Sequence, residues 1–281
     1  MSITGKARLA GVMGWPVAHS RSPQLHGHWL ARYGIDGAYV PLPVKPEHLA
    51  EALLALPKLG FAGVNLTVPH KEAALTLMTD LEPLARRIGA VNTVIVRADG
   101  TLAGRNTDAY GVHMSLDEGA PLWRRHTGPA VVLGAGGAAR AVGAALVDQG
   151  GVSELRLVNR SRVRAEALAA ALGGPIRVFG WEEAGRALAG ATLLVNATTL
   201  GMAGQPPLTL ALDPLDPAAT VLDLVYAPVE TGLLRAARAR SLIAVDGIGM
   251  LLHQARPGFA AWFGVDPEVT AELRAAVLAT R

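Results

Sequence analysis

Polar side chains that could bind a small molecule or transfer a proton stand where predicted strands end and predicted helices begin. The first group is Asn65, Thr67 and Lys71, at the junction between a strand over 62–66 and a helix from about His70. Open α/β sheets bind their ligands at the carboxyl ends of parallel strands, and lysine, unlike arginine, can lose its proton when partly desolvated. The junction therefore suits a ligand site, although turn formation, capping and a solvated lysine would account for the same residues.

A second group of polar residues follows in the next part of the chain. Asn92 begins a predicted strand in GAVNTVIV, and Asn106 and Asp108 close the polar segment TLAGRNTD, 101–108, which we expect to be a turn leading into a helix near 109–116. Asp108 could simply favour the helix dipole as a first-turn carboxylate. The amide and carboxylate groups at these element ends nevertheless exceed what turns usually need, which favours a binding site.

A pair of serines lies earlier, in AHSRSPQLH. Ser20 and Ser22 flank an arginine directly before Pro23, which suits the first turn of a helix. The two hydroxyls could cap that helix, or they could bind a small carboxylate together with free main-chain N–H groups. From spacing alone, capping is the favoured role.

A glycine-rich turn indicates another ligand site. In VVLGAGGAA, from Val131 to Ala139, an apolar β-branched run leads into Gly134, Gly136 and Gly137, and an alanine-rich segment with helical spacing follows. In such a unit the first glycine makes the turn, the second lets the backbone approach a pyrophosphate, and the small third position brings the helix close to the strand. The pattern favours a dinucleotide site over a plain tight turn. A P-loop is excluded because no Gly-Lys-Ser/Thr follows.

The residues after the next strand bear on which dinucleotide fits. A strand over 155–158 leads into Asn159, Arg160 and Ser161, with Arg164 one helical step on. NAD-binding units usually carry an acidic residue here for the ribose hydroxyls, whereas two guanidinium groups can grip a 2′-phosphate. A basic helix start that merely faces solvent is disfavoured, because cations there oppose the helix dipole. The sequence therefore predicts NADP(H) as the cofactor rather than NAD.

The elements that must position these residues alternate between strand and helix. Such alternation is typical of an α/β fold with parallel sheets. Besides the strand that feeds the glycine turn, strands are predicted near 9–14, 38–44, 62–66, 155–158, 176–179, 192–196, 221–225 and 243–245. Helices are predicted near 46–56, 81–86, 109–116, 162–172 and 248–263.

Composition limits the class of protein. The 281 residues are 51% hydrophobic and 17% charged with a net charge of +3, which fits a globular chain long enough for two domains. Scattered basic residues with few aromatics argue against a nucleic-acid partner. The absence of cysteine excludes disulfides and thiolate metal sites, and the histidines show no metal-ligand spacing, so no metal is expected. No stretch approaches membrane-spanning length, and no signal peptide is recognisable, so a cytoplasmic location is expected.

Nearly the whole chain resembles one family. The motifs HSRSP, VNLTVPHKE, GAVNT, GRNTD, GAGGAAR, NRSRVR, NATTLGM, DLVY and DGIGMLLHQ stand in the order in which shikimate dehydrogenases carry them. The resemblance implies an oxidoreductase that reversibly reduces 3-dehydroshikimate to shikimate with NADPH, in chorismate and aromatic amino-acid biosynthesis. The chain departs from the pattern at Ala109, where the family often has glycine, and we take this as a tolerated variation.

The resemblance also implies roles for individual residues. Lys71 and Asp108 would be the catalytic pair, with the ammonium stabilising the carbonyl oxygen and handing over a proton. The substrate would be bound, with its carboxylate on the serines, by Ser20, Ser22, Asn65, Thr67, Asn92, Tyr226 and Gln254. The cofactor would be bound by Gly134, Gly136, Gly137, Ala138, Asn159, Arg160, Ser161, Arg164, Thr198, Thr199, Gly247 and Met250. For Tyr226 and Met250, packing explains the residue type equally well.

The expected architecture has two α/β domains. A substrate-binding domain would comprise 1–107 and 247–281, and a Rossmann-like NADP-binding domain with a doubly wound parallel sheet would comprise 108–246. A cleft between them would hold the nicotinamide against the substrate and could exclude water on closure. A small-molecule substrate is the expected partner, and the protein is expected to be a monomer or a homodimer.

Alternatives remain open at this stage. Within the same class, the substrate could be quinate or an aminated relative of shikimate. A methyltransferase can also use a glycine-rich strand, turn and helix, but it usually has an acidic residue where this chain has Asn159 and Arg160. An NADPH-binding regulatory module without catalysis is the alternative outside the enzymes, and the presence of both Lys71 and Asp108 argues against it.

Overall fold

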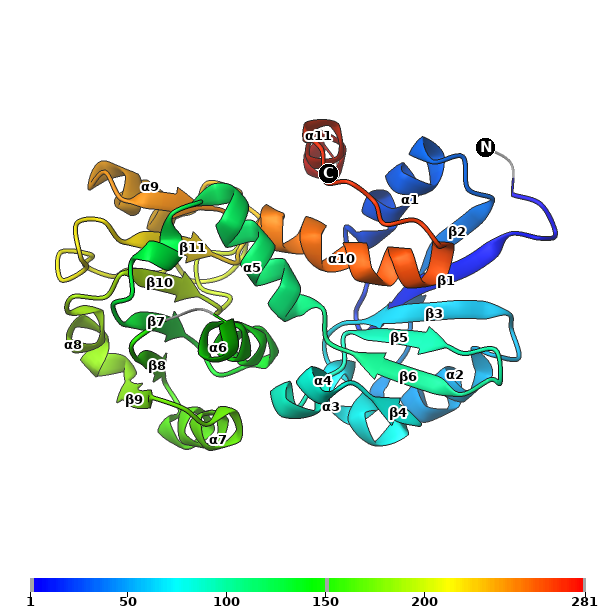
Figure 1. Ribbon diagram of the computed structural model, residues 1–281, viewed down its shortest axis with the longest axis horizontal. Coiled ribbons are helices and arrows are strands. Elements are labelled where there is room, and N and C mark those ends of the chain that lie inside the picture. Colours follow the sequence, from blue (N-terminus) through cyan, green and yellow to red (C-terminus); the bar gives the residue numbers. More distant parts are fainter. Residues whose placement is uncertain (1–2, 150–151, 280–281) are drawn as a thin grey trace. The chain divides into compact units, whose positions relative to one another are not determined.

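The computed structural model describes residues 3–149 and 152–279. The chain divides into two compact units (Figure 1): unit 1 comprises Met1–Thr107 and Gln254–Arg281, and unit 2 comprises Asp108–His253. Unit 1 is therefore built from both ends of the chain.

The second boundary between the units lies inside helix α10 (Ile248–Phe263), later than the expected change before Gly247. The first turn of α10 is packed within unit 2. Gly249 lies so close to Ser115 that an added Cβ would be 2.6 Å from the serine Oγ. This close packing explains why the start of α10 belongs to unit 2.

Unit 1 contains a mixed six-stranded sheet in the order β2-β1-β3-β5-β6-β4. β1 pairs in parallel with both β2 and β3, whereas β5 is antiparallel to β3 and to β6. The strands are β1 Arg8–Gly14, β2 Gly37–Pro43, β3 Phe61–Leu66, β4 Asp80–Leu81, β5 Thr93–Val96 and β6 Leu102–Arg105. The mixed directions place the end of β3 beside the start of β5.

Strand β6 corrects the prediction of a turn over 101–108. Leu102–Arg105 pairs with β5 along its whole length, and Leu102 and Ala103 are buried. Gly104 faces tight packing, because an added Cβ would lie 2.6 Å from the Met78 side chain. The prediction was wrong because a glycine followed by a polar stretch is typical of a turn, while here it permits close packing within a strand.

The helices of unit 1 pack on this sheet, and the C-terminal segment is bound to the N-terminal part of the unit (Figure 1). Trp262 Nε1 donates to the Val94 carbonyl at 3.0 Å, and Trp29 Nε1 donates to the Glu268 carbonyl at 2.9 Å. Both indoles are almost completely buried. The helices are α1 Ser22–Arg32, η1 Pro46–His48, α2 Leu49–Ala55, α3 His70–Ala73, η2 Ala74–Leu77, α4 Pro83–Ile88, the later part of α10, and α11 Ala271–Ala279.

Unit 2 contains a parallel six-stranded sheet in the order β12-β11-β10-β7-β8-β9. This is the doubly wound order in which the chain reverses direction across the sheet between β7 and β10, and it confirms the expected Rossmann-like fold. The strands are β7 Ala130–Leu133, β8 Leu155–Asn159, β9 Ile176–Gly180, β10 Leu193–Asn196, β11 Thr220–Asp223 and β12 Ile243–Val245. Strand β11 ends two residues before the predicted Val225.

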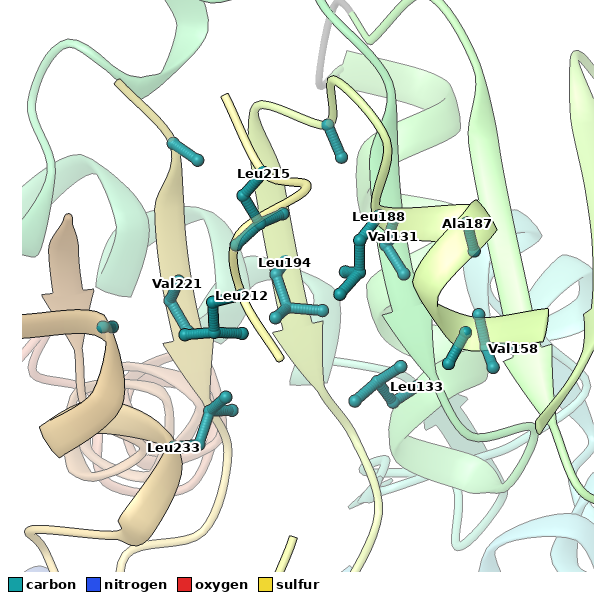
Figure 2. Close-up of a cluster of buried hydrophobic side chains, with 14 of the residues drawn as sticks. Val131, Leu133, Val158, Ala187, Leu188, Leu194, Leu212, Leu215, Val221 and Leu233 are labelled. Atoms are coloured by element: carbon teal, nitrogen blue, oxygen red, sulfur yellow. The ribbon is translucent and has the colours of Figure 1, made fainter. Parts of the chain in front are cut away.

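Helices cover the sheet of unit 2 and bury its apolar residues. Figure 2 shows one such cluster, in which Val131, Leu194 and Val221 of neighbouring strands pack against Leu188 and Leu233. Parallel strands buried in this way read as continuous apolar runs. The helices are α5 Asp108–Gly119, η3 Trp123–Arg125, α6 Gly137–Gln149, α7 Arg162–Leu172, η4 Trp181–Glu183, α8 Ala184–Leu188, α9 Gly232–Ala239 and the start of α10.

Candidate functional site

A buried hydrogen-bond network in unit 1 begins at Asn65, near the end of β3. The Asn65 Nδ2 donates to the main-chain carbonyl of Asn92 at 3.1 Å and to Thr93 Oγ1 at 3.2 Å. The Asn65 Oδ1 accepts from the Tyr39 hydroxyl at 2.6 Å. Asn65 is only 6% exposed. Its amide is therefore held by the protein on both sides.

The network continues through Asn92 to the C-terminal part of the unit. Asn92 Oδ1 accepts from the Thr107 main-chain N–H at 2.8 Å, and its Nδ2 donates to Thr107 Oγ1 at 3.0 Å and to Gln254 Oε1 at 3.4 Å. Thr107 Oγ1 also donates to the Gln254 carbonyl at 2.8 Å. Asn65, Asn92 and Gln254, which lie far apart in sequence, are thus joined in one network.

Lys71 and Thr67 are anchored to the same part of the sheet by their main chains. The Lys71 carbonyl accepts from the N–H of Val91, the residue before Asn92, at 2.8 Å, and the Thr67 N–H donates to the Met13 carbonyl at 3.0 Å. Both side chains are partly exposed. The main chain of Lys71 is thus bonded to the residue before Asn92, and the Lys71 and Thr67 side chains stay accessible to a ligand.

The two serines at the start of α1 have different roles from the expected cap. Arg21 occupies the N-cap position and makes no side-chain cap, while Ser22 is the first helical residue. Ser20 Oγ accepts a hydrogen bond from the Ser22 main-chain N–H at 3.3 Å, so Ser20 satisfies one N–H group at the start of the helix. The Ser22 residue is 7% exposed. The prediction that both hydroxyls serve as caps is therefore wrong for Ser22.

Tyr39 and Thr93 were not predicted as part of this network. Thr93 lies inside the motif GAVNT, next to Asn92, and its Oγ1 donates to Asn92 Oδ1 at 2.9 Å. Tyr39 lies in the middle of β2, where a tyrosine looks like an ordinary core residue. Only the strand order, with β1 between β2 and β3, shows that its ring can reach Asn65.

A buried histidine packs against the Tyr39 ring. His26, on α1, is fully buried and stacks on Tyr39 with ring centroids 3.8 Å apart and planes 3° apart. Neither ring nitrogen has a hydrogen-bond partner among the residues that the structure describes. Burial accordingly lowers the pKa of His26 from 6.5 to about 3.

This burial predicts a pH dependence of stability. An unfolded chain protonates His26 below pH 6.5, while the folded protein keeps it neutral down to about pH 3. The contribution of His26 to the free energy of unfolding therefore falls with the pH, by about 2 kcal/mol between pH 7 and pH 5. Urea unfolding at both pH values should show that His26→Phe, which keeps an aromatic ring against Tyr39, removes this part of the loss. Equal losses in the two proteins would contradict the assignment.

The glycine turn of unit 2 leaves open space at the start of α6. Gly134 has φ +112°, and an added Cβ would lie 3.1 Å from the Ala197 carbonyl oxygen, so the protein itself requires glycine there. At Gly136 and Gly137 an added Cβ would meet nothing within 4 Å. Glycine at these two positions leaves open space beside the N-terminus of α6, as a close approach by a pyrophosphate requires. Ala138, in the first turn of α6, is partly exposed, and Ala139 is fully buried.

The loop after β10 lies beside this turn, at the point where the strand order reverses. Asn196 Oδ1 accepts from Thr198 Oγ1 at 2.7 Å and from the Thr198 N–H at 3.1 Å. Asn196 is itself held by buried Asp223, whose Oδ1 accepts from Asn196 Nδ2 at 2.9 Å. Burial raises the pKa of Asp223. Thr198 is thus rigidly placed near Gly134, whereas Thr199 is exposed.

The segment after β8 presents exposed cations. Asn159 Nδ2 donates to the Ser161 carbonyl at 2.9 Å and shapes the turn into α7. Arg162 forms ion pairs with Glu166 and Glu183, at 3.0 and 3.6 Å. Neither Arg160 nor Arg164, both exposed, forms an ion pair with any described acidic residue. These residues and the glycine turn together fit a dinucleotide that carries an extra phosphate.

The remaining predicted residues are placed as follows. Gly247 is buried where a Cβ would lie 2.4 Å from the Leu224 carbonyl oxygen, so close packing requires a glycine there. Tyr226 and Met250 are partly exposed in unit 2. Asp108 is 4% exposed and opens α5, directly after Thr107 of the unit 1 network.

The described residues contain neither a metal-ligand cluster nor a membrane-spanning helix. No group of three or more His, Asp or Glu residues there could hold a metal ion. No helix among them is long and apolar enough to cross a membrane.

Comparisons with known proteins agree with these features. A family model described as the shikimate dehydrogenase substrate binding domain matches residues 12–94. The chain is 62% identical to shikimate dehydrogenase (NADP(+)) of Paramagnetospirillum magneticum, covering 98% of this chain and 100% of the relative. It is 64% identical to the enzyme of the same name from Rhodospirillum rubrum, covering 98% of this chain and 99% of the relative.

Solved structures give the same result. Shikimate 5-dehydrogenase from Thermus thermophilus, in complex with NADP(H) and shikimate, matches with a TM-score of 0.84 and 39% identity, covering 96% of this chain and 98% of that one. Quinate dehydrogenase from Corynebacterium glutamicum, in complex with NAD, matches with a TM-score of 0.90 and 33% identity, covering 98% and 99%. On full-length identity and on fold, this chain belongs to the shikimate dehydrogenase family.

Proposed function

We propose that this protein catalyses the reversible NADPH-dependent reduction of 3-dehydroshikimate to shikimate. The observation that carries the proposal is the identity of 62% and 64%, over 98% of the chain, to relatives named for this activity. The polar network of unit 1 and the glycine turn of unit 2 supply the two kinds of binding site that such a reaction needs. The place of the reaction in chorismate and aromatic amino-acid biosynthesis follows from the same relationship.

In this proposal, unit 1 binds the substrate. Ser20 and Ser22 hold the carboxylate with the start of α1, because hydroxyl donors suit an anion. The ring oxygens are bound by Asn65, Thr67, Asn92 and Gln254, and Tyr226 is assigned to the carboxylate. The rigidity of the amide network supports this role, since pre-organised polar groups orient a ligand.

Lys71 and Asp108 are the proposed catalytic pair. A bound NADPH supplies the hydride. The Lys71 ammonium stabilises the negative charge that develops on the carbonyl oxygen and donates the proton that completes the hydroxyl. The Asp108 carboxylate holds the ammonium in place and accepts a hydrogen bond from a substrate hydroxyl.

The nucleotide is assigned to unit 2. Gly134, Gly136, Gly137 and Ala138 would carry the pyrophosphate at the start of α6. Arg160 and Arg164, with Asn159 and Ser161, would bind the 2′-phosphate. Thr198, Thr199, Gly247 and Met250 are proposed to line the rest of the nucleotide site.

A quinate dehydrogenase is the second candidate, because a solved quinate dehydrogenase shares the fold with a TM-score of 0.90. That enzyme was solved with NAD, whereas the two exposed arginines here favour NADP. NADP⁺ reduction should be followed at elevated pH with shikimate and with quinate in parallel. We expect kcat/KM for shikimate to exceed that for quinate. A higher kcat/KM with quinate would replace the first proposal with the second.

We further propose that the protein works in the cytoplasm as a monomer or homodimer. A biosynthetic reaction that consumes NADPH suits that compartment. Light scattering coupled to size-exclusion chromatography should give a mass of one or two chains of 29.2 kDa. A larger assembly would contradict this part of the proposal.

A further inference from the structure

The direction of each hydrogen bond around Tyr39 can be assigned from the atoms that surround Asn65. The main-chain carbonyl of Asn92 can only accept, so the Asn65 atom 3.1 Å from it must be the amide nitrogen. The Asn65 oxygen therefore faces the Tyr39 hydroxyl at 2.6 Å. Tyr39 must be the donor in that bond, because an amide oxygen has no hydrogen to give.

The bond to Asn65 uses the only hydrogen of the Tyr39 hydroxyl. Tyr39 is 7% exposed, and burial raises its pKa well above the ordinary value, so the hydroxyl stays protonated. The free protein thus has a chain of bonds that runs in one direction, from Tyr39 through Asn65 to the Asn92 carbonyl and Thr93 Oγ1.

The strand register explains how the Tyr39 side chain reaches Asn65. Ala10 of β1 is paired with Tyr39 of β2, and Val12, two residues on, is paired with Asn65 of β3. Residues two apart in a strand lie on the same face. Tyr39 and Asn65 therefore share one face of the sheet, and the tyrosine side chain passes over β1 between them.

This chain of bonds limits what Asn65 can offer to a ligand. Both Nδ2 hydrogens are used, one by the Asn92 carbonyl and one by Thr93 Oγ1 at 3.2 Å. The oxygen has one remaining lone pair. Asn65 can therefore accept a hydrogen from a ligand hydroxyl but cannot donate one to a ligand carbonyl.

We propose that Tyr39 is a positioning residue that fixes the Asn65 amide as an acceptor and so makes the substrate site select a ring hydroxyl at that point. The inference rests on the proposed function and deepens it. Without the Tyr39 hydroxyl, the Asn65 oxygen loses its buried donor, and the amide is held only through its nitrogen, by the Asn92 carbonyl and Thr93 Oγ1. The acceptor oxygen is then placed less precisely, and the preference of the site for a hydroxyl hydrogen at this position weakens.

The test pairs Tyr39→Phe with substrate analogues. The probes are shikimate and the two analogues that each lack one of the ring hydroxyls that are not oxidised. With the wild-type protein, kcat/KM should be about 5- to 50-fold lower than for shikimate when the analogue lacks the hydroxyl that donates a hydrogen bond to Asn65. With Tyr39→Phe, kcat/KM for shikimate itself should fall by a similar factor. In this variant, kcat/KM for the same analogue should be less than about threefold lower than kcat/KM for shikimate.

His26→Phe is the matched control, because it alters the ring stacked on Tyr39 but removes none of the bonds in the chain. In His26→Phe, kcat/KM should fall as much for the analogue without the hydroxyl as it does in the wild-type protein. Thermal unfolding of both variants checks that they are folded. A purely structural role for Tyr39 would give equal analogue penalties in all three proteins and would overturn the inference. No oxidation of shikimate by the wild-type protein would instead overturn the proposed function.

Discussion

Replacing Lys71 with alanine is expected to lower kcat for shikimate oxidation by about 10²- to 10⁴-fold, with only a small change in KM. The reason is that the ammonium acts on charge that appears at the reacting oxygen during hydride transfer. An interaction made mainly in the transition state affects kcat rather than substrate binding. Steady-state kinetics at saturating NADP⁺ measures both constants.

Lys58→Ala is the control for this variant, because Lys58 is exposed and lies outside the proposed site. It should retain wild-type constants. A Lys71→Ala protein that keeps its kcat and loses only affinity for shikimate would show that Lys71 is a binding residue, and the proposed mechanism would then need a different proton donor.

The second large effect concerns the choice of nucleotide. The double variant Arg160→Ser with Arg164→Ser is expected to lower the ratio of kcat/KM for NADPH to kcat/KM for NADH by about 10²-fold. Two guanidinium groups would be lost from a 2′-phosphate that NADH does not have, so activity with NADH should change little. Kinetics with both nucleotides at a fixed substrate concentration gives the ratio.

Arg162→Ser provides the matched control in the same helical turn. Arg162 is already paired with Glu166 and Glu183, at 3.0 and 3.6 Å, and should contribute little to nucleotide binding. Its loss should leave the nucleotide ratio near the wild-type value. A wild-type protein that uses both nucleotides with similar kcat/KM would remove the basis for assigning the phosphate to Arg160 and Arg164.

The fold of unit 2 could be predicted from sequence because its signals are local. Val131 to Leu133 and Leu193 to Val195 are continuous apolar runs, as expected of parallel strands buried on both faces. The glycines then mark the turn between β7 and α6. Strand β6 of unit 1 could not be found in this way, because Leu102–Arg105 is held by pairing with β5 and by packing of Met78 on Gly104. Such contacts are not visible in a short stretch of sequence.

The residue types of the candidate site could be predicted, but their connections could not. Asn65, Asn92 and Gln254 follow from polar groups at element ends and from family motifs. That they form one network depends on the strand order, which places β5 beside β3. Tyr39 had no local signal at all, since a tyrosine within a strand usually packs in the core. The direction of its hydrogen bond follows from the other partners of Asn65, which the sequence does not show.

The most direct test is to mix the purified protein with 3-dehydroshikimate and NADPH, and to follow nucleotide oxidation while identifying the product by chromatography. The account predicts one shikimate formed for each NADPH oxidised, with far slower oxidation of NADH. Binding of NADPH without any turnover of 3-dehydroshikimate would contradict it and would indicate a nucleotide-binding module instead of an enzyme of this activity.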